Sequence, residues 1–368
     1  MANIFIRTSI APYRIDTYNA LVERLGMRMC FYSREDGEQH FDPDWIESQC
    51  RFRPTYLKGW HFGPESRTVC RGLRKLVREE DPDVVIVPEF QFALWQMRWI
   101  RRFRRHKFKI VSMCDDSLDM ILNANDFSAG HRRLRSFVPK KLDDIITVTP
   151  DVCRWYRDRF GKGQWLPIIP DEKRMREIYA RLLPRSRALE QHYGLSGKPV
   201  AMYVGRLVAL KNVETVIDVF ARTAREDAVL VIIGDGEQRE KLESRAAGCG
   251  RTVLFTGRLE GDALYAWYNL CDVLLLLSRR EAFGAVTGEA LMAGAKALVS
   301  SRAGSACLIT ENNGCVADID DTPSMVRGLE SLLPEKTARR FDLLRPSGMQ
   351  VTLDERMDAL VAAFGGGE

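Results

Sequence analysis

The sequence predicts an α/β protein made of two doubly wound, Rossmann-like domains. Short apolar strands alternate with amphipathic helices through the first half of the chain, and the same alternation begins again at Lys198. Such alternation is typical of parallel sheets that are covered by helices on both faces. The length of 368 residues exceeds what one hydrophobic core usually serves, which also favours two domains.

The first domain is placed at residues 1–170. Strands are expected at residues 3–9, 28–33, 84–88, 108–113 and 143–149. Helices are expected at residues 17–26, 66–80, 93–106 and 150–161. Residues 40–63 are rich in Trp, Arg and Pro and fit no clear element, so they are interpreted as an irregular insertion.

The second domain is placed at residues 171–350, after a proline-containing linker between about 167 and 198. Strands are expected at residues 199–205, 228–234, 252–257, 272–278 and 296–301, and helices at 212–225, 237–248, 261–271 and 288–295. Residues 351–368 form a C-terminal helix that could pack on either domain. Two such domains facing each other would enclose a cleft, with ligands bound outside the carboxyl ends of the strands.

The composition is that of a folded globular protein, with 45% hydrophobic and 29% charged residues. No apolar run approaches the roughly 20 residues of a membrane span, and the N-terminus alternates like a strand rather than a signal peptide. Nine cysteines are scattered without a C-x-x-C pair, which predicts reduced thiols and no structural zinc. We therefore expect the protein to remain in the cytoplasm.

The charge is distributed unevenly along the chain. Residues 1–200 carry 36 Lys and Arg against 26 Asp and Glu, whereas residues 201–368 carry 19 against 24. The basic first half is therefore the half expected to face an anionic surface or ligand.

One candidate site is the segment "YVGRLVALKN" at residues 203–212. A strand ends at Gly205, where the backbone can approach a ligand closely, and the following loop carries Arg206 and Lys211. Two cations beside a helix N-terminus suit a diphosphate. The segment is neither a G-x-x-x-x-G-K loop nor a G-x-G-x-x-G fingerprint, which removes the main support for an ATPase or a dehydrogenase. A solvated basic loop is the alternative.

A second candidate site is "SRREAFGAVTGEALMAGA" at residues 278–295. Glu281 lies in a loop and Glu289 in the following helix, so the two carboxylates span a loop-to-helix turn. Carboxylates accept hydrogen bonds from sugar hydroxyls, and the amides of residues 284–287 suit an anion. The alternative makes Glu289 a first-turn acid of the helix and Glu281 a partner of Arg279 or Arg280.

The strings "GRLVALKN", "VIIGDGEQREKLE", "VLFTGRLEGDAL" and "EAFGAVTGEALMAG" resemble, in order and spacing, glycosyltransferase family 4, whose members have the GT-B fold. The similarity spans residues 203–314. In the first domain, "APYRIDTYNAL" is similar to the start of bacterial polysaccharide-assembly members. The resemblance implies a retaining, metal-independent transferase of the hexosyltransferase type, with a nucleoside diphosphate sugar as donor and no cofactor.

The resemblance also implies roles for particular residues. Arg206 and Lys211 would neutralise the donor diphosphate, while Glu281 would hold hydroxyls of the transferred sugar. Glu289 would bind the ribose. The donor site implied by the resemblance comprises Gly205, Arg206, Lys211, Arg258, Leu259, Glu281, Phe283, Gly284, Ala285 and Glu289.

On the acceptor side, Tyr13 and Arg14 replace paired glycines that many relatives use. Asp115 and Asp116 stand where many relatives place a histidine near the reacting sugar. Asp116 could take over that catalytic contact, or both aspartates could cap the next helix.

Residues 98–109, from Arg98 to Lys109, contain seven Lys and Arg interleaved with Trp99, Ile100, Phe103 and Phe108. This pattern fits peripheral contact with an anionic membrane, at the cytoplasmic face of the inner membrane, or an ordinary solvated helix face. No nucleic-acid motif accompanies it.

The predicted function is transfer of a sugar, from a UDP-sugar in preference to a GDP-sugar, to a hydroxyl of a saccharide acceptor. The resemblance and the basic first half favour a lipid-linked acceptor in the synthesis of a bacterial surface polysaccharide, such as capsule or lipopolysaccharide. The alternatives are a non-catalytic nucleotide-sugar-binding or scaffold subunit, and another GT-B enzyme such as a nucleotide-sugar epimerase.

Overall fold

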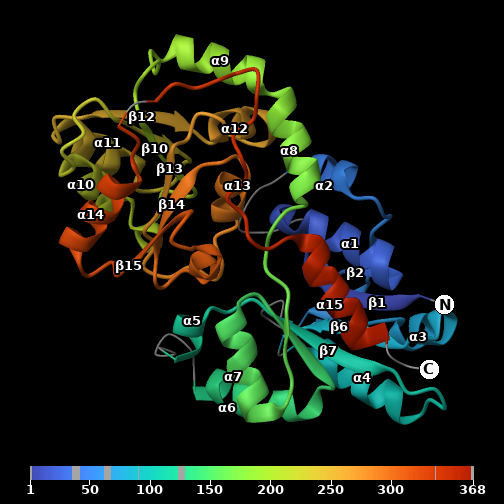
Figure 1. Ribbon diagram of the computed structural model, residues 1–368. Helices are drawn as coiled ribbons and strands as arrows, with labels where there is room; N and C mark the ends of the chain where they lie inside the picture. Colours follow the sequence, from blue (N-terminus) through green and yellow to red (C-terminus); the bar gives the residue numbers. More distant parts are fainter. Residues whose placement is uncertain are drawn as a thin grey trace. The chain divides into compact units, whose positions relative to one another are not determined.

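The computed structural model describes residues 2–34, 42–61, 68–89, 91–122, 129–335 and 337–365. The chain forms two compact units (Figure 1). The first domain consists of Met1–Pro170 together with Leu353–Glu368, and the second domain consists of Asp171–Thr352. The C-terminal helix therefore belongs to the first domain.

The first domain contains a seven-stranded parallel sheet in the order β3-β2-β1-β6-β7-β8-β9. Its strands are β1 (Asn3–Arg7), β2 (Met27–Phe31), β3 (Thr55–Tyr56), β6 (Val84–Pro88), β7 (Lys109–Cys114), β8 (Asp144–Thr147) and β9 (Gln164–Trp165). Strand β1 pairs with β2 on one side and β6 on the other, so the strand order reverses between β1 and β6. Ligands of such sheets bind at this reversal, outside the carboxyl ends of the strands.

Successive buried side chains of each strand point to opposite faces of this sheet, and helices cover both faces. Ile4 belongs to a core that also includes side chains of α3, α4 and α7, whereas the Phe5 ring lies 5.3 Å from the Tyr18 ring of α1. Helix α15 packs beside α1 (Figure 1), and Arg24 of α1 forms an ion pair with Asp358 of α15. The helices are α1 (Ile15–Leu25), α2 (Pro43–Gln49), α3 (Leu73–Glu80), α4 (Phe92–Arg102), α5 (Leu118–Leu122), α6 (Ala129–Phe137), α7 (Pro150–Phe160) and α15 (Leu353–Gly365).

Two expectations for the first domain are wrong. The helix expected at residues 66–80 begins only at Leu73, because Gly72 adopts a φ of 81° and the preceding β5 (Thr68–Cys70) pairs antiparallel with β4 (Gly59–His61). The supposed irregular insertion at residues 40–63 contains α2, β3 and β4. Residues 40, 41, 62 and 63 lie outside the described part of the chain.

The second domain contains a six-stranded parallel sheet in the order β12-β11-β10-β13-β14-β15. Its strands are β10 (Val200–Val204), β11 (Val229–Ile233), β12 (Thr252–Gly257), β13 (Val273–Leu276), β14 (Lys296–Ser300) and β15 (Gly314–Ala317). The order reverses between β10 and β13, as in dinucleotide-binding folds. The helices are α8 (Glu172–Arg181), α9 (Leu183–His192), α10 (Val213–Ala221), α11 (Arg239–Ala247), α12 (Gly261–Tyr268), α13 (Val286–Met292) and α14 (Thr322–Leu332).

The expected linker between about 167 and 198 is not a linker over most of its length. Helices α8 and α9 occupy it and belong to the second domain. The Ser186 hydroxyl of α9 donates to the Ala266 carbonyl at 2.8 Å. The side-chain amide of Asn269 donates to the Tyr179 carbonyl of α8 at 3.0 Å. These buried contacts hold both helices against α12.

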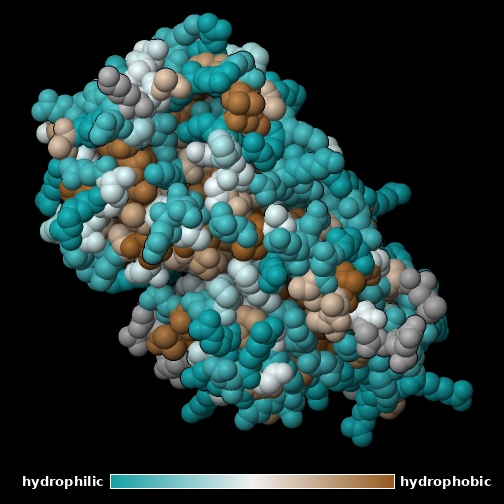
Figure 2. Space-filling model, in the orientation of Figure 1, coloured by the Kyte–Doolittle hydropathy of each residue, from teal (hydrophilic) through white to brown (hydrophobic). Residues whose placement is uncertain are grey.

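Hydrophilic residues cover most of the molecular face shown in Figure 2, and hydrophobic residues form small separate patches on it. Among the described helices, none combines the length and the apolar character that a membrane crossing would need.

Candidate functional site

The loop that follows β10 abuts the loop that follows β11. A Cβ atom added at Gly234 would lie 1.8 Å from the Gly205 carbonyl oxygen, and one at Gly236 would lie 2.5 Å from the Leu207 carbonyl oxygen. The Leu207 amide donates to the Asp235 carbonyl at 2.8 Å. Only glycine allows this close approach, so the "GDG" segment after β11 shapes the candidate phosphate loop. Our predicted site did not include these two glycines, although their spacing signals a backbone contact.

Asn212 joins the loops that follow β10 and β13. It adopts the left-handed conformation, with φ at 56°, directly before α10. Its side-chain amide donates to the Leu277 carbonyl at 3.1 Å, and its side-chain oxygen accepts from Arg279 Nε at 3.2 Å. The Arg279 amide in turn donates to the Leu210 carbonyl at 3.0 Å. These bonds fasten together the two loops that flank the strand reversal.

Lys211 and Glu281 form an ion pair across these two loops. Their side chains are only 18% and 14% exposed, which makes the pair stronger than one on the open surface. The alternative paired Glu281 with Arg279 or Arg280. The structure pairs Glu281 with Lys211, and Arg279 bonds to Asn212. Arg206 lies in the same loop and is exposed. Its carbonyl accepts from the Tyr203 hydroxyl at 2.9 Å.

The turn after Glu281 is held by the loop that follows β14. The Ser305 amide donates to the Phe283 carbonyl at 2.7 Å, and the Gly304 amide donates to the Glu281 carbonyl at 3.2 Å. Gly284 has a φ of 94°, and a Cβ there would lie 2.5 Å from Leu276 Cδ2. The amide of Thr287 donates to the Gly284 carbonyl at 3.0 Å. That amide is therefore engaged within the turn, which differs from the expectation that it faces an anion.

Glu289 is held by two tyrosines of the same domain. The Tyr268 hydroxyl donates to Glu289 Oε2 at 2.6 Å, and the Tyr179 hydroxyl donates to the Glu289 carbonyl at 2.9 Å. Burial and the neighbouring Glu289 charge raise the pKa of Tyr268, which keeps its hydroxyl a donor. Both tyrosines were missed by sequence reasoning, because aromatic residues on a helix usually indicate only core packing.

The Gly257 turn lies beside the glycine loop, since the Gly234 amide donates to the Gly257 carbonyl at 2.9 Å. Arg258 is exposed and forms a hydrogen bond of 2.7 Å with Glu260. Leu259 is half-buried, as is Ala285 directly before α13. The second domain thus places its predicted donor residues on the loops after β10, β12 and β13, except for Glu289, which lies in α13.

In the first domain, two arginines converge on Asp115 at the carboxyl end of β7. Arg14 is fully buried and lies 2.6 Å from Asp115 Oδ1, while Arg7 pairs with the other carboxylate oxygen. Burial alone would raise the pKa of Asp115, but the charges of Arg14 and Arg7 outweigh it and lower that pKa. Arg14 thus points into the domain, whereas Tyr13 beside it is 40% exposed. No feature of the sequence indicated the role of Arg7.

Asp116 pairs with Arg135 and stands beside Glu89, at the end of β6. The first turn of α5 is capped by Ser117, whose hydroxyl accepts from the Met120 amide at 3.4 Å. The interpretation of Asp115 and Asp116 as caps is therefore wrong. Burial, together with the charge of Asp116, raises the pKa of Glu89 to about 8.

Glu89, Cys114 and Asp116 could each offer a metal-ligand atom, all within 4.8 Å of one another. Arg135 already neutralises Asp116, and burial raises the pKa of the Cys114 thiol well above its ordinary value. A protonated thiol beside a fixed guanidinium is a poor cation site. We assign no metal to this cluster.

Solved structures of known proteins share this architecture. The lipopolysaccharide outer core galactosyltransferase WaaB superposes with a TM-score of 0.67 at 17% identity, over 99% of this chain and 100% of its own. Anabaena HepE in complex with UDP gives a TM-score of 0.68 at 15% identity, over 99% of this chain and 95% of its own. At such identities the likeness concerns the fold alone. It confirms the predicted GT-B fold with its two Rossmann-like domains.

The comparison with family models concerns the second domain. The family model described as "Glycosyl transferases group 1" matches residues 186–342. Over these residues the chain is similar to the group 1 glycosyltransferases, which confirms the resemblance to family 4.

Relatives match over part of their length. A GDP-mannose-dependent alpha-mannosyltransferase of Mycolicibacterium smegmatis is 32% identical over 41% of this chain and 36% of its own. The alpha-D-kanosaminyltransferase of Streptomyces kanamyceticus is 32% identical over 42% of both chains. A GDP-mannose-dependent alpha-(1-6)-phosphatidylinositol monomannoside mannosyltransferase of Mycobacterium tuberculosis is 28% identical over 61% of this chain and 62% of its own. The chain thus spans less than two thirds of these curated relatives.

Proposed function

We propose that the chain is a retaining glycosyltransferase that moves a sugar from a nucleoside diphosphate sugar to a hydroxyl of a saccharide acceptor. The observation that carries this proposal is the Lys211–Glu281 ion pair at the strand reversal of the second domain. It places a cation and a sugar-binding carboxylate side by side, in a domain of the group 1 glycosyltransferases.

The two charges have complementary tasks in this proposal. Cleavage of the sugar–phosphate bond builds negative charge on the diphosphate, which Lys211 and the exposed Arg206 stabilise. Glu281 accepts hydrogen bonds from the sugar hydroxyls, and its ion pair with Lys211 keeps it oriented. The glycine loop at Gly205 and Gly234 lets the backbone approach the phosphates. Glu289, oriented by Tyr268, binds the ribose.

The reaction is proposed to need neither a cofactor nor a catalytic metal, because fixed cations stand at the leaving group. The first test is therefore turnover in the presence of a chelator. Activity that disappears with the chelator and returns with a divalent cation would contradict this part of the proposal.

The base of the donor is tested by a screen. The sequence relatives named above include GDP-mannose-dependent enzymes, whereas HepE holds UDP. The predicted preference for UDP therefore competes with a GDP-sugar. Purified protein is expected to gain thermal stability with one family of nucleotide sugars and to hydrolyse it slowly. Binding without hydrolysis of any donor would favour a scaffold subunit, and no stabilisation by any nucleotide sugar would contradict the proposal.

A lipid-linked acceptor at the membrane surface is the remaining part of the proposal, and α4 supports it. Trp99 and Phe103 are 57% and 66% exposed, and their rings pack edge to face at 5.2 Å. Several basic residues of this segment are already occupied, as Arg101 pairs with Asp143 and Arg104 with Asp81. Contact with the membrane would therefore depend on the exposed aromatic side chains as much as on the positive charge of the segment.

The membrane contact is tested with vesicles of phosphatidylglycerol and of phosphatidylcholine. A Trp99→Ser/Phe103→Ser variant is expected to sediment less with the anionic vesicles than the unaltered protein. Leu343→Ser, at a 62% exposed position of the second domain, is the matched control. Equal sedimentation of all three proteins would overturn the membrane contact.

A further inference from the structure

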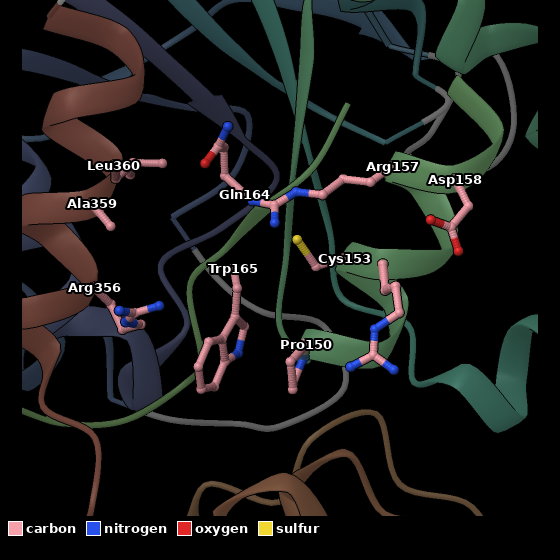
Figure 3. A pocket seen from close by; sticks show the side chains of 10 residues that line it. Pro150, Cys153, Arg157, Asp158, Gln164, Trp165, Arg356, Ala359 and Leu360 are labelled. Atoms are coloured by element: carbon pink, nitrogen blue, oxygen red, sulfur yellow. The ribbon is translucent and has the colours of Figure 1, made fainter. Parts of the chain in front are cut away.

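A pocket of about 290 Å³ lies in the first domain between α7 and α15, next to the edge strand β9 (Figure 3). None of its residues belongs to the donor site in the second domain. It is lined by Pro150, Cys153, Arg154, Arg157, Asp158, Gln164, Trp165, Arg356, Ala359 and Leu360.

Three arginines line this pocket, and among the described residues none of them has a carboxylate partner at ion-pair distance. Arg157 donates its Nε to the Gly163 carbonyl at 2.9 Å. The guanidinium of Arg356 lies over the Trp165 ring, 4.9 Å from its centre. Arg154 is exposed at the rim. By contrast, Arg24 on the neighbouring α1 pairs with acids of α15.

The arrangement leaves one buried donor of a lining residue unused. Arg356 Nε is buried and has no hydrogen-bond partner in the described part of the chain, although buried donors are normally paired. The one acidic lining residue, Asp158, lies farther out along α7, while Arg157 reaches toward Gln164 (Figure 3). The pocket therefore carries a local excess of positive charge and one unsatisfied buried donor.

We infer that this arginine pocket binds the phosphoryl group of a small phosphate ester. Guanidinium groups are suited to phosphate oxygens, which they bind with charge-assisted hydrogen bonds. The volume of about 290 Å³ is at the small end of ligand sites, which suits a phosphorylated polyol or monosaccharide better than a nucleotide sugar. A bound phosphate would join α7 to α15 and fasten the C-terminal helix to its domain.

Isothermal titration of the full chain with inorganic phosphate and with glycerol 3-phosphate tests this inference. Saturable binding is expected, and Arg356→Gln and Arg154→Gln should each weaken it about tenfold, because each removes a charge-assisted contact. Arg159→Gln is the matched control, since Arg159 is on the same helix but stacks on Trp155 outside the pocket. Binding that is weakened in Arg356→Gln but retained in Lys211→Gln belongs to this pocket and not to the donor site.

Vesicles of phosphatidylglycerol distinguish a lipid headgroup from a soluble ester. Binding of vesicles that is lost in Arg356→Gln, with no binding of either soluble probe, would assign the phosphoryl group to a lipid. Unchanged thermal unfolding of Arg154→Gln shows that a loss of binding is not a loss of folding. The inference is overturned if no probe binds up to about 10 mM, well above the millimolar Kd of a weak site, or if both arginine variants bind like Arg159→Gln.

Discussion

The two sheets of this protein reverse their strand order in the same way, yet the loops at the two reversals are built differently. In the second domain, glycines and Asn212 bring two loops together around the partly exposed Lys211–Glu281 pair. In the first domain, the buried Arg14 turns inward and holds Asp115. The same topology thus supports a charge pair between two loops in one domain and a charge pair anchored by a fully buried arginine in the other.

The largest expected effect is a loss of activity when Glu281, the acid of the charge pair in the second domain, is replaced. Glu281→Ala should lower kcat about 100- to 1,000-fold, because the sugar loses its orienting acceptor. Nucleotide affinity should change less than about threefold, since Glu281 is assigned to the sugar and not to the base or ribose. Turnover with the cognate donor and calorimetry with the nucleotide measure both. Glu240→Ala, at an exposed position of α11, is the control, and surviving activity in Glu281→Ala would refute the sugar assignment.

The next effect concerns the stability of the first domain. Asp115→Asn should lower its free energy of unfolding by about 3 kcal/mol, because the buried Arg14 would lose its counter-charge. Six of the seven tryptophans lie in the first domain, so fluorescence during urea unfolding follows that domain. Nucleotide binding by the second domain should be unchanged.

The matched control is Asp83→Asn, which removes an exposed pair with His106. It should lower the free energy of unfolding by less than about 1 kcal/mol. Equal effects of the two substitutions would mean that the Arg14–Asp115 contact is no stronger than a surface pair.

A smaller effect is expected from the glycine turn of the second domain. Gly284→Ala should destabilise that domain by about 2 kcal/mol, because φ is 94° and the new Cβ would meet Leu276 and Ser305. Gly248→Ala should be neutral or slightly stabilising, because its φ is −84° and its nearest neighbour would be 3.7 Å away. Thermal unfolding of both variants measures the difference. A stable Gly284→Ala protein would show that the turn can relax.

The remaining effect on stability is a pH dependence in the first domain. The pKa of Glu89 is raised to about 8, so the folded state keeps its proton between the ordinary value of about 4.3 and pH 8, while the unfolded state loses it. The contribution of Glu89 to the free energy of unfolding is therefore fully present below pH 4, and it is lost as the pH rises from about 4 to about 8.

Glu89→Gln should remove this loss and raise the free energy of unfolding at pH 8 relative to pH 5 by about 1–3 kcal/mol. Urea unfolding at the two pH values measures the change, with the exposed Glu79→Gln as control. An identical pH profile for the unaltered protein and Glu89→Gln would contradict the raised pKa.

The sequence predicted local features better than long-range ones. Strand–helix alternation and the positions of Lys211 and Glu281 follow from short motifs. The Arg14–Asp115 pair joins residues 101 positions apart, and nothing in either local sequence indicates that they meet. The short strands β3, β4 and β5 were missed because two or three residues are too few to show an alternating pattern. The role of Tyr268 in holding Glu289 likewise depends on a contact between two helices.

The most direct test of the donor assignment is the affinity of Lys211→Gln for a nucleoside and for its diphosphate. Calorimetry with the base chosen by the donor screen should show a diphosphate affinity about tenfold or more below that of the unaltered protein, since one charge-assisted contact is lost. Affinity for the nucleoside alone should be unchanged. An equal diphosphate affinity in both proteins would contradict the assignment of Lys211 to the leaving group.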